Sequence, residues 1–199
     1  VVRNGIRNEK SLRLLIRKLA DSVMQPTAVK RLQNILQGDG TKITRETINT
    51  YLDYLHDSYL MFGVSCFTDT VAQRETIKKH YFYDNGILNL FLFQPETKLL
   101  ENIVAIALYK RYGQDLYYYN KNVEVDFCVP TEGLLVQASY RLTDEATKER
   151  EIGALLKVAP FLKARRCVIV TYDQEETIHS AELGMDIEII PAYKFLLKG

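Results

Sequence analysis

The stretch that decides the fold runs from Asn120 to Tyr140 and reads NKNVEVDFCVPTEGLLVQASY. In its first half, valines and a phenylalanine alternate with Glu124 and Asp126, and this period of two predicts a strand with one buried face. A proline and a glycine within residues 130–133 predict a turn. The apolar run at 134–140 then predicts a second strand beside the first.

Polar residues of the two predicted strands suggest a chemistry. The first strand carries Asp126, and the second carries Gln137 and Ser139 two positions apart on one face. An acidic strand followed by a strand with polar residues two apart is how metal-dependent nucleases bring oxygen ligands to a metal ion. A lysine normally follows the second ligand by two residues and orients the attacking water. Ser139 stands in that position, so the pattern fits either a working site or the remains of one.

Composition narrows the class of protein. The chain has 199 residues, of which 47% are hydrophobic and 11% aromatic, so it can bury a core and is not globally disordered. A net charge of +1 provides no overall basic field. Nucleic-acid binding would therefore depend on a local patch.

The pattern of cysteines and the lack of long apolar runs indicate a cytoplasmic location. Cys66, Cys128 and Cys167 are far apart and include no C-x-x-C pair, so we interpret them as buried thiols in a reducing compartment. We see no signal peptide and no apolar run of about 18 residues, so no membrane association is expected. The chain begins at Val1, and we interpret it as a fragment of a longer protein.

The N-terminal half predicts three amphipathic helices, the first capped by Ser11, the second by Pro26-Thr27 and the third by Thr44. The helices are expected at 11–24, 28–37 and 44–57. Two strands at 59–67 and 76–83, joined by a polar stretch, complete a winged-helix pattern. Pro95 marks the expected boundary between a first domain, 1–95, and a second, 96–199.

The C-terminal half predicts the element order αβββαβ, followed by a further strand and helix, which indicates an α/β layer with a mixed sheet. The helices are expected at 98–112 and 145–160, with a closing helix from Pro191. The strands are expected at 116–120, 123–129, 134–140, 166–172 and 186–190.

Four short motifs give the chain a resemblance to a known family. They are Val123-Glu124-Val125-Asp126-Phe127, Leu100-Glu101-Asn102, Tyr83-Asp84-Asn85-Gly86, and Ile189-Ile190-Pro191 followed by Phe195-Leu196-Leu197. In this order the chain resembles the C-terminal region of prokaryotic AAA-type ATPases. Those proteins carry a winged helix and then a domain of unknown function similar to the PD-(D/E)xK nucleases.

The resemblance implies an α+β fold with an N-terminal winged-helix domain and an α/β restriction-endonuclease-like domain with a mixed sheet. It also implies that an ATPase domain, absent from this chain, is its natural partner. The sequence agrees, because it contains no G-x-x-x-x-G-K-[ST] phosphate-binding loop. ATP binding is therefore expected of the full-length protein and not of this chain.

The same resemblance assigns roles to the candidate site. Glu101 matches the helix carboxylate and Asp126 the metal-binding aspartate, so both would hold Mg²⁺ in a working enzyme. Gln137 stands where a second carboxylate is usual and Ser139 where the lysine is usual. Without that charge and that ammonium group we expect no catalysis and no cofactor, with Mg²⁺ only if the site is active. Lys121, Lys148 or Arg150 could migrate into the role of the lysine.

Three interpretations remain open at this stage. The first is a non-catalytic binding module whose residues Glu101, Glu124, Asp126 and Gln137 form a polar, hydrogen-bonded cleft. The second is an active Mg²⁺-dependent DNA nuclease with a rearranged site. The third is a structural module that forms homo-oligomers.

DNA is a candidate partner through the predicted helix at 44–57. Arg45 and Asn49 could contact base edges there. Basic residues before this helix and in the predicted wing could add contacts, namely Lys42, Arg74, Lys78 and Lys79. Glu46, Asp53 and Asp57 would repel phosphate, so a protein-binding face is an equal alternative.

Overall fold

The computed structural model describes residues 8–38, 40, 42–67, 70 and 77–197. The first half contains three helices, a two-residue strand, a hairpin and a short helix. They are α1 (Glu9–Asp21), β1 (Thr27–Ala28), α2 (Val29–Gly38), α3 (Arg45–Asp57), β2 (Met61–Cys66), β3 (Ile77–Phe82) and α5 (Asn85–Asn89). None of the described helices is long and apolar enough to cross a membrane.

The second half alternates helices and strands, as its hydrophobic pattern predicts. The elements are α6 (Glu96–Tyr112), β4 (Tyr117–Asn120), β5 (Glu124–Val129), β6 (Leu134–Ala138), α7 (Glu145–Leu162), β7 (Arg166–Thr171), β8 (Glu176–Ser180), β9 (Met185–Pro191) and α8 (Ala192–Leu197). Short 3₁₀ turns at Gly113–Asp115 and Pro130–Glu132 follow α6 and β5.

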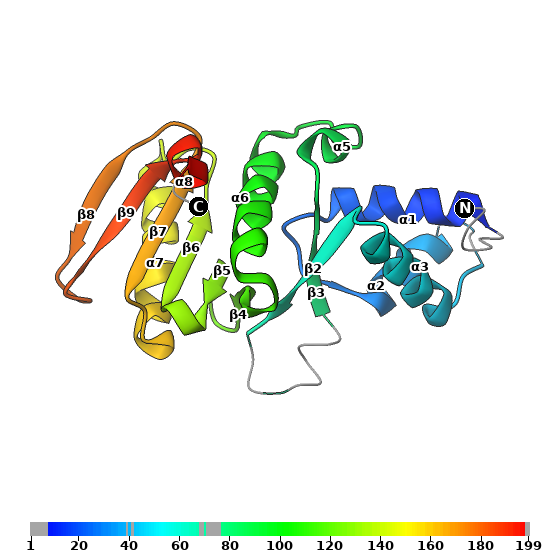
Figure 1. Cartoon of the computed structure of the whole chain (residues 1–199), viewed down its shortest axis with the longest axis horizontal. Coiled ribbons are helices and arrows are strands. Elements are labelled where there is room, and N and C mark those ends of the chain that lie inside the picture. Colours follow the sequence, from blue (N-terminus) through cyan, green and yellow to red (C-terminus); the bar gives the residue numbers. More distant parts are fainter. Residues whose placement is uncertain (1–7, 39, 41, 68–69, 71–76, 198–199) are drawn as a thin grey trace.

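One mixed sheet runs through both halves. The described strands lie in the order β1-β3-β2-β4-β5-β6-β7-β9-β8 (Figure 1). The β2–β3 hairpin joins the rest through a parallel pairing of β2 with β4, at Ser65↔Tyr117 and Cys66↔Tyr118. β6, β7 and β9 are also parallel neighbours, whereas β4, β5 and β6 form an antiparallel meander. The predicted mixed sheet is therefore confirmed.

Helices cover both faces of the central strands. On one face, Val136 and Val168 pack in a core that also contains Val104 of α6. On the other, Leu135 and Ile169 pack with Leu155 of α7. The core on the α6 side extends to the first helices of the chain, so one apolar interior crosses the position of Pro95.

This two-sided covering corrects the prediction of a single buried face for β5. Phe127, Cys128 and Val129 are all at most 1% exposed, because the sheet has a helix layer on each side. A short run of consecutive apolar residues is the pattern of such a strand.

Several helix boundaries also differ from expectation. Thr44 caps α3 as predicted, accepting a hydrogen bond from Thr47 N–H at 3.2 Å. The side chain of Asn8, not Ser11, caps α1, and Thr27 lies in β1 instead of capping α2. α6 begins at Glu96, directly after Pro95, and so starts two residues before the helix expected at 98–112.

Two differences concern the end of the chain. β8 was not predicted, because its residues (ETIHS) are short and polar, as suits an edge strand. Pro191 closes β9 instead of opening α8. A proline is tolerated at that terminal position because few ladder hydrogen bonds are lost there.

A buried amide fastens the hairpin to α6. Asn102 is fully buried, and its side chain accepts from Phe82 N–H at 2.8 Å and donates to Phe82 C=O at 3.0 Å. It also donates to Asn85 Oδ1 at 2.8 Å. The amide thus acts as a strand partner for the last residue of β3 and fixes where α6 begins relative to the hairpin.

Replacing this amide tests the junction. Asn102→Ala leaves both polar groups of Phe82 without the amide, so we expect a loss of about 2–4 kcal/mol of unfolding free energy. Urea denaturation followed by circular dichroism measures it. The control is Asn49→Ala, on the exposed face of α3, which should change stability by less than about 0.5 kcal/mol. Equal effects of the two substitutions would contradict the assignment.

Candidate functional site

A polar cleft of about 540 Å³ lies where β5 and β6 separate, between the N-terminal half of α6 and α7. Most of its charged lining groups are carboxylates. The lining residues include Thr97, Glu101, Glu124, Asp126, Gln137, Ser139, Glu149, Arg150, Glu151 and Lys157. The cleft therefore brings together all four residues predicted for the vestigial site, namely Glu101, Asp126, Gln137 and Ser139.

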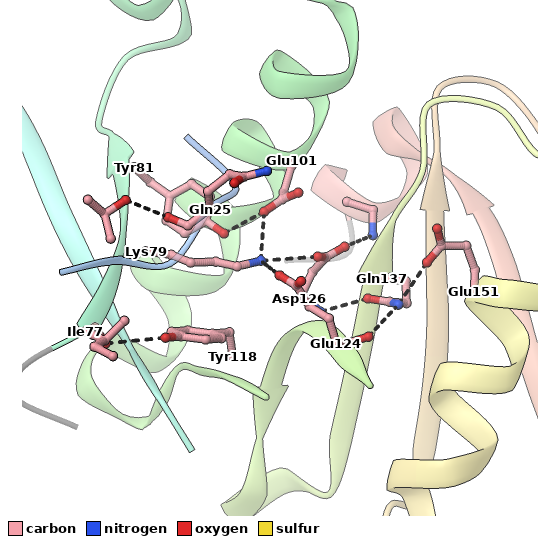
Figure 2. Close-up of polar contacts among 12 residues, drawn as sticks. Gln25, Ile77, Lys79, Tyr81, Glu101, Tyr118, Glu124, Asp126, Gln137 and Glu151 are labelled. Carbon is pink, nitrogen blue, oxygen red and sulfur yellow. Dashed lines mark hydrogen bonds and ion pairs between the residues drawn. The ribbon is translucent and has the colours of Figure 1, made fainter. Parts of the chain in front are cut away.

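The centre of the site is an ammonium group that the sequence did not place there. Lys79 of β3 points from the hairpin into the carboxylates at the base of the cleft (Figure 2). Its Nζ lies 2.8 Å from Glu124 Oε1, 3.3 Å from Asp126 Oδ1 and 3.5 Å from Glu101 Oε1. The side chain is 0% exposed, and Glu101 is 1% exposed.

Tyr81, two residues along β3, completes this group. Its hydroxyl donates to Glu101 Oε1 at 2.7 Å, and its side chain is fully buried. Lys79 and Tyr81 point to the same side of β3 because side chains two apart in a strand share a face. We call Lys79, Tyr81, Glu101, Glu124 and Asp126 the lysine cluster.

The lysine cluster contains one ammonium group and three carboxyl groups, and these groups shift one another's pKa values. Burial by itself lowers the pKa of Lys79, but the nearby carboxylates of Glu101, Asp126 and Glu124 raise it above its ordinary value, so the amine stays protonated. Burial, and then the charge of Asp126, raises the pKa of Glu101 to about 8, against the opposing effect of Lys79. Such a raised pKa stabilises the fold at low pH, and this contribution is lost as the pH rises through about 8.

Gln137 has a structural task that a metal ligand could not perform. Its Oε1 accepts from the backbone N–H of Asp126 at 2.7 Å, and its Nε2 donates to Glu124 C=O at 3.2 Å. Nε2 also donates to Glu151 Oε2 at 2.9 Å. The amide therefore replaces ladder hydrogen bonds beyond the last paired residues of the two strands, Phe127↔Val136.

The side chain of Asp126 also bonds to the backbone of the neighbouring strand. Its Oδ2 accepts from Ala138 N–H at 2.9 Å, while Oδ1 faces Lys79. Side chains thus bridge β5 and β6 where the backbones part, which keeps the mouth of the cleft open.

Ser139 lies one residue beyond β6 and is mostly buried. Its N–H donates to Val170 C=O at 2.9 Å, and its hydroxyl donates to Arg141 C=O at 3.4 Å. It therefore links β6 to β7 and supplies no cationic group to the cleft.

The side chains expected to migrate into the lysine's role are engaged elsewhere. Lys121 lies over the ring of Phe161, and Lys148 pairs with Glu176 at 2.8 Å. Arg150 pairs with Glu151 at 2.7 Å at the rim of the cleft. Lys79 is the residue that sequence reasoning missed. Its signal was the alternation of β3, which places a lysine and a tyrosine on one face.

A divalent metal does not fit this arrangement. Lys79 already faces Glu101 and Asp126, and the side-chain oxygen of Gln137 is committed to a backbone N–H. Within the described part of the chain, no three His, Cys, Asp or Glu side chains are grouped so as to hold a metal ion. Glu101 and Asp126 therefore act as partners of an ammonium group in this structure.

The residues predicted to contact DNA differ in how exposed their side chains are. Lys42, Arg45 and Asn49 are exposed, with Arg45 Nε donating to Gln33 Oε1 at 3.1 Å, and Lys78 is half-buried. The assignment of Lys79 to this surface was wrong, because its side chain points to the opposite side and is buried. Arg74 lies outside the described residues.

The chain is similar to a protein family and to two proteins whose descriptions name no activity. Residues 3–98 match a family described as "Domain of unknown function (DUF8612)". An uncharacterised protein of Methanocaldococcus jannaschii is 36% identical over 99% of this chain and 46% of its own length. An uncharacterised protein of Haemophilus influenzae is 27% identical over 71% of this chain and 37% of its own length. The chain thus spans less than half of either relative, and no solved structure matches it.

Removing the ammonium group should destabilise the protein strongly. Lys79→Met leaves the buried Glu101 and the partly buried Asp126 without their counter-ion, so we expect a loss of about 3–5 kcal/mol at pH 8, measured by urea denaturation. Glu101, whose pKa burial already raises, can then avoid the charge by taking up a proton, so the variant should recover stability as the pH falls. Lys30→Met, on the exposed surface of α2, is the matched control.

The double variant Lys79→Met/Glu101→Gln separates charge from packing. If the ion pair dominates, the second substitution restores a large part of the lost stability, and the coupling energy of the double-mutant cycle exceeds about 1 kcal/mol. Additive losses would show that Lys79 contributes mainly through the packing of its stem.

Placing a carboxylate at position 137 should harm the fold. Gln137→Glu removes the donor to Glu124 C=O and faces a new charge toward Glu151, so we expect a loss of about 2–4 kcal/mol at pH 8. Thermal denaturation at pH 8 and pH 5 measures it, with a smaller loss at pH 5 because the new carboxyl can protonate. Gln114→Glu, at an exposed site, is the control, and equal losses would contradict the bridging role of Gln137.

Proposed function

We propose that the chain is a non-catalytic binding module, built of a winged-helix domain (1–95) and a degenerate PD-(D/E)xK nuclease-like domain (96–199). The element order supports this reading. Three helices precede the β2–β3 hairpin, and α6, β4, β5, β6, α7 and β7 follow in the order αβββαβ. Its resemblance to the C-terminal region of prokaryotic AAA-type ATPases makes an ATPase domain its natural neighbour in a cytoplasmic protein.

The observation that carries the proposal is the position of Lys79. Its ammonium contacts Glu101, Glu124 and Asp126 at the place where a nuclease of this class would gather a metal ion. Lys79 is buried beneath the cleft, so it cannot reach a scissile phosphate in place of the missing lysine. The site therefore stabilises the fold, and the module needs no metal cofactor.

The charge of α3 favours a protein partner over DNA. Its exposed face carries Arg45 against Glu46, Asp53 and Asp57, and Arg45 is hydrogen-bonded to α2. A helix that binds the major groove depends on cationic contacts with phosphate, and three carboxylates oppose them. The partner surface is therefore a protein surface, and the ATPase portion of the full-length protein is the first candidate. The relative from M. jannaschii extends well beyond the matched part, which leaves room in that protein for a further domain.

A cleavage assay tests the absence of catalysis. Supercoiled plasmid and single-stranded DNA incubated with the chain and Mg²⁺ or Mn²⁺ should remain intact, at the level of a matched preparation of Asp126→Ala. Metal-dependent cleavage by the wild-type chain that disappears in Asp126→Ala would overturn the proposal and establish a nuclease.

A binding assay tests the choice of partner. Fluorescence polarisation of labelled duplex DNA should show no salt-dependent shift with the wild-type chain at micromolar concentration. The charge-reversed variant Glu46→Lys/Asp53→Lys should gain such binding, because it removes the repulsion. Tight wild-type binding that weakens steeply with salt and is lost in Arg45→Ala would instead identify α3 as a DNA-binding helix.

A further inference from the structure

Two histidines that the proposed function does not use lie face to face between α3 and the hairpin. His56, in the last turn of α3, stacks on His80 of β3 with ring centroids 5.7 Å apart and planes inclined by 23°. His80 is 6% exposed. The contact joins α3 to the hairpin.

Both rings contain a buried nitrogen that lacks a hydrogen-bond partner. These atoms are His56 Nε2 and His80 Nδ1, and neither has a partner within the described part of the chain. A buried polar atom without a partner costs stability, so its retention calls for a physical explanation. A neutral imidazole must keep one nitrogen unprotonated, and an unpartnered nitrogen is where an added proton would go.

Gly63 of β2 lies directly beside the stacked pair. It lies opposite His80 in the β2–β3 ladder, and a Cβ atom placed on it would come within 3.9 Å of His56 Cε1 and 3.1 Å of Lys78 Cδ. The contact with His56 would be an ordinary van der Waals contact, whereas the one with Lys78 is tight, so a side chain at position 63 would have to displace the stem of Lys78 beside the pair.

The charged residues around the pair affect the protonation of the two rings differently. Lys78 of β3 opposes protonation of both histidines, whereas Asp53 and Asp57 of α3 favour protonation of His56. Burial is the largest effect on each ring and lowers both pKa values, that of His80 to about 3. A first proton on either ring therefore makes a second one harder to add, since the two cations would face each other in a buried contact.

We infer that His56 and His80 form an acid-sensitive joint between α3 and the β2–β3 hairpin, which opens when the imidazoles take up protons. In the closed state both rings are neutral and stacked. When α3 moves away, each ring reaches water and can bind a proton at its ordinary affinity. Acid therefore favours the open state. The face of α3 that packs against the hairpin is accessible only in that state. This inference does not depend on what the module binds.

The size of the effect follows from linkage. The ordinary pKa of histidine is 6.5, and that of His80 in the closed state is about 3. Because the pKa of His80 is lower in the closed state, the closed state keeps its full stability above about pH 6.5. That stability is lost as the pH falls below this value. From His80 alone, the opening equilibrium should increase roughly 30-fold between pH 7.5 and pH 5.0.

Hydrogen exchange resolved by segment tests the joint. After correction for intrinsic exchange rates, the amides of α3 should lose protection by about this factor between pH 7.5 and pH 5.0. The amides of β6 and β7 should stay protected, because they lie in the covered centre of the sheet. This local readout is needed because Glu101 shifts global stability with pH in the opposite sense.

Variants identify the groups responsible. His80→Phe keeps an aromatic ring without a titratable nitrogen, so α3 should remain protected at pH 5.0. If that variant does not fold, His56→Phe serves the same purpose from the other side. His179→Gln, an exposed histidine paired with Asp186, is the control and should respond like the wild type. The inference is overturned if α3 protection does not change with pH, if β6 and β7 open in parallel with α3, or if the response persists in the phenylalanine variant.

Discussion

The interaction on which the structure depends most is the contact of one buried ammonium group with three carboxylates. Lys79 reaches them from β3, and they belong to α6 and β5. A buried charge is costly unless it is paired and hydrogen-bonded, so the carboxylates and Lys79 require one another. This mutual requirement places the hairpin, α6 and β5 at one point, and the cleft opens directly beside it.

The same contact explains how the two halves form one body. The backbone pairing between them is short, with two pairs of residues between β2 and β4. Asn102 adds a second polar attachment from α6 to the end of β3, and the apolar core continues across the boundary. A slip of β3 by one residue would turn Lys79 and Tyr81 to the wrong face, since strand side chains alternate. The lysine cluster therefore also fixes the register of the hairpin, and the fold is more integrated than two independent domains.

Local patterns in the sequence were sufficient to predict most elements. The helix capped by Thr44, the hairpin strands and the β5–β6 pair follow from periodicity and turn residues, and Glu101, Asp126, Gln137 and Ser139 do meet at one cleft. Lys79 could not be assigned in the same way, because it lies 47 residues before Asp126 and its role depends on tertiary pairing. β8 lacked an apolar signal, and the bridging of Gln137 between diverging backbones depends on geometry that no spacing encodes.

Direct observation of the Lys79 side chain tests the central claim. Nitrogen-15 NMR of the lysine ammonium groups at neutral pH, with Lys79 assigned by its loss in Lys79→Arg, should show one resonance with slow proton exchange and correlations to nearby carboxylates. On raising the pH, this amine should deprotonate after the exposed lysines, because its carboxylate partners raise its pKa. A Lys79 signal that exchanges and titrates like those of surface lysines would show that the ammonium does not lie among the carboxylates, and the account of a structural, non-catalytic site would be wrong.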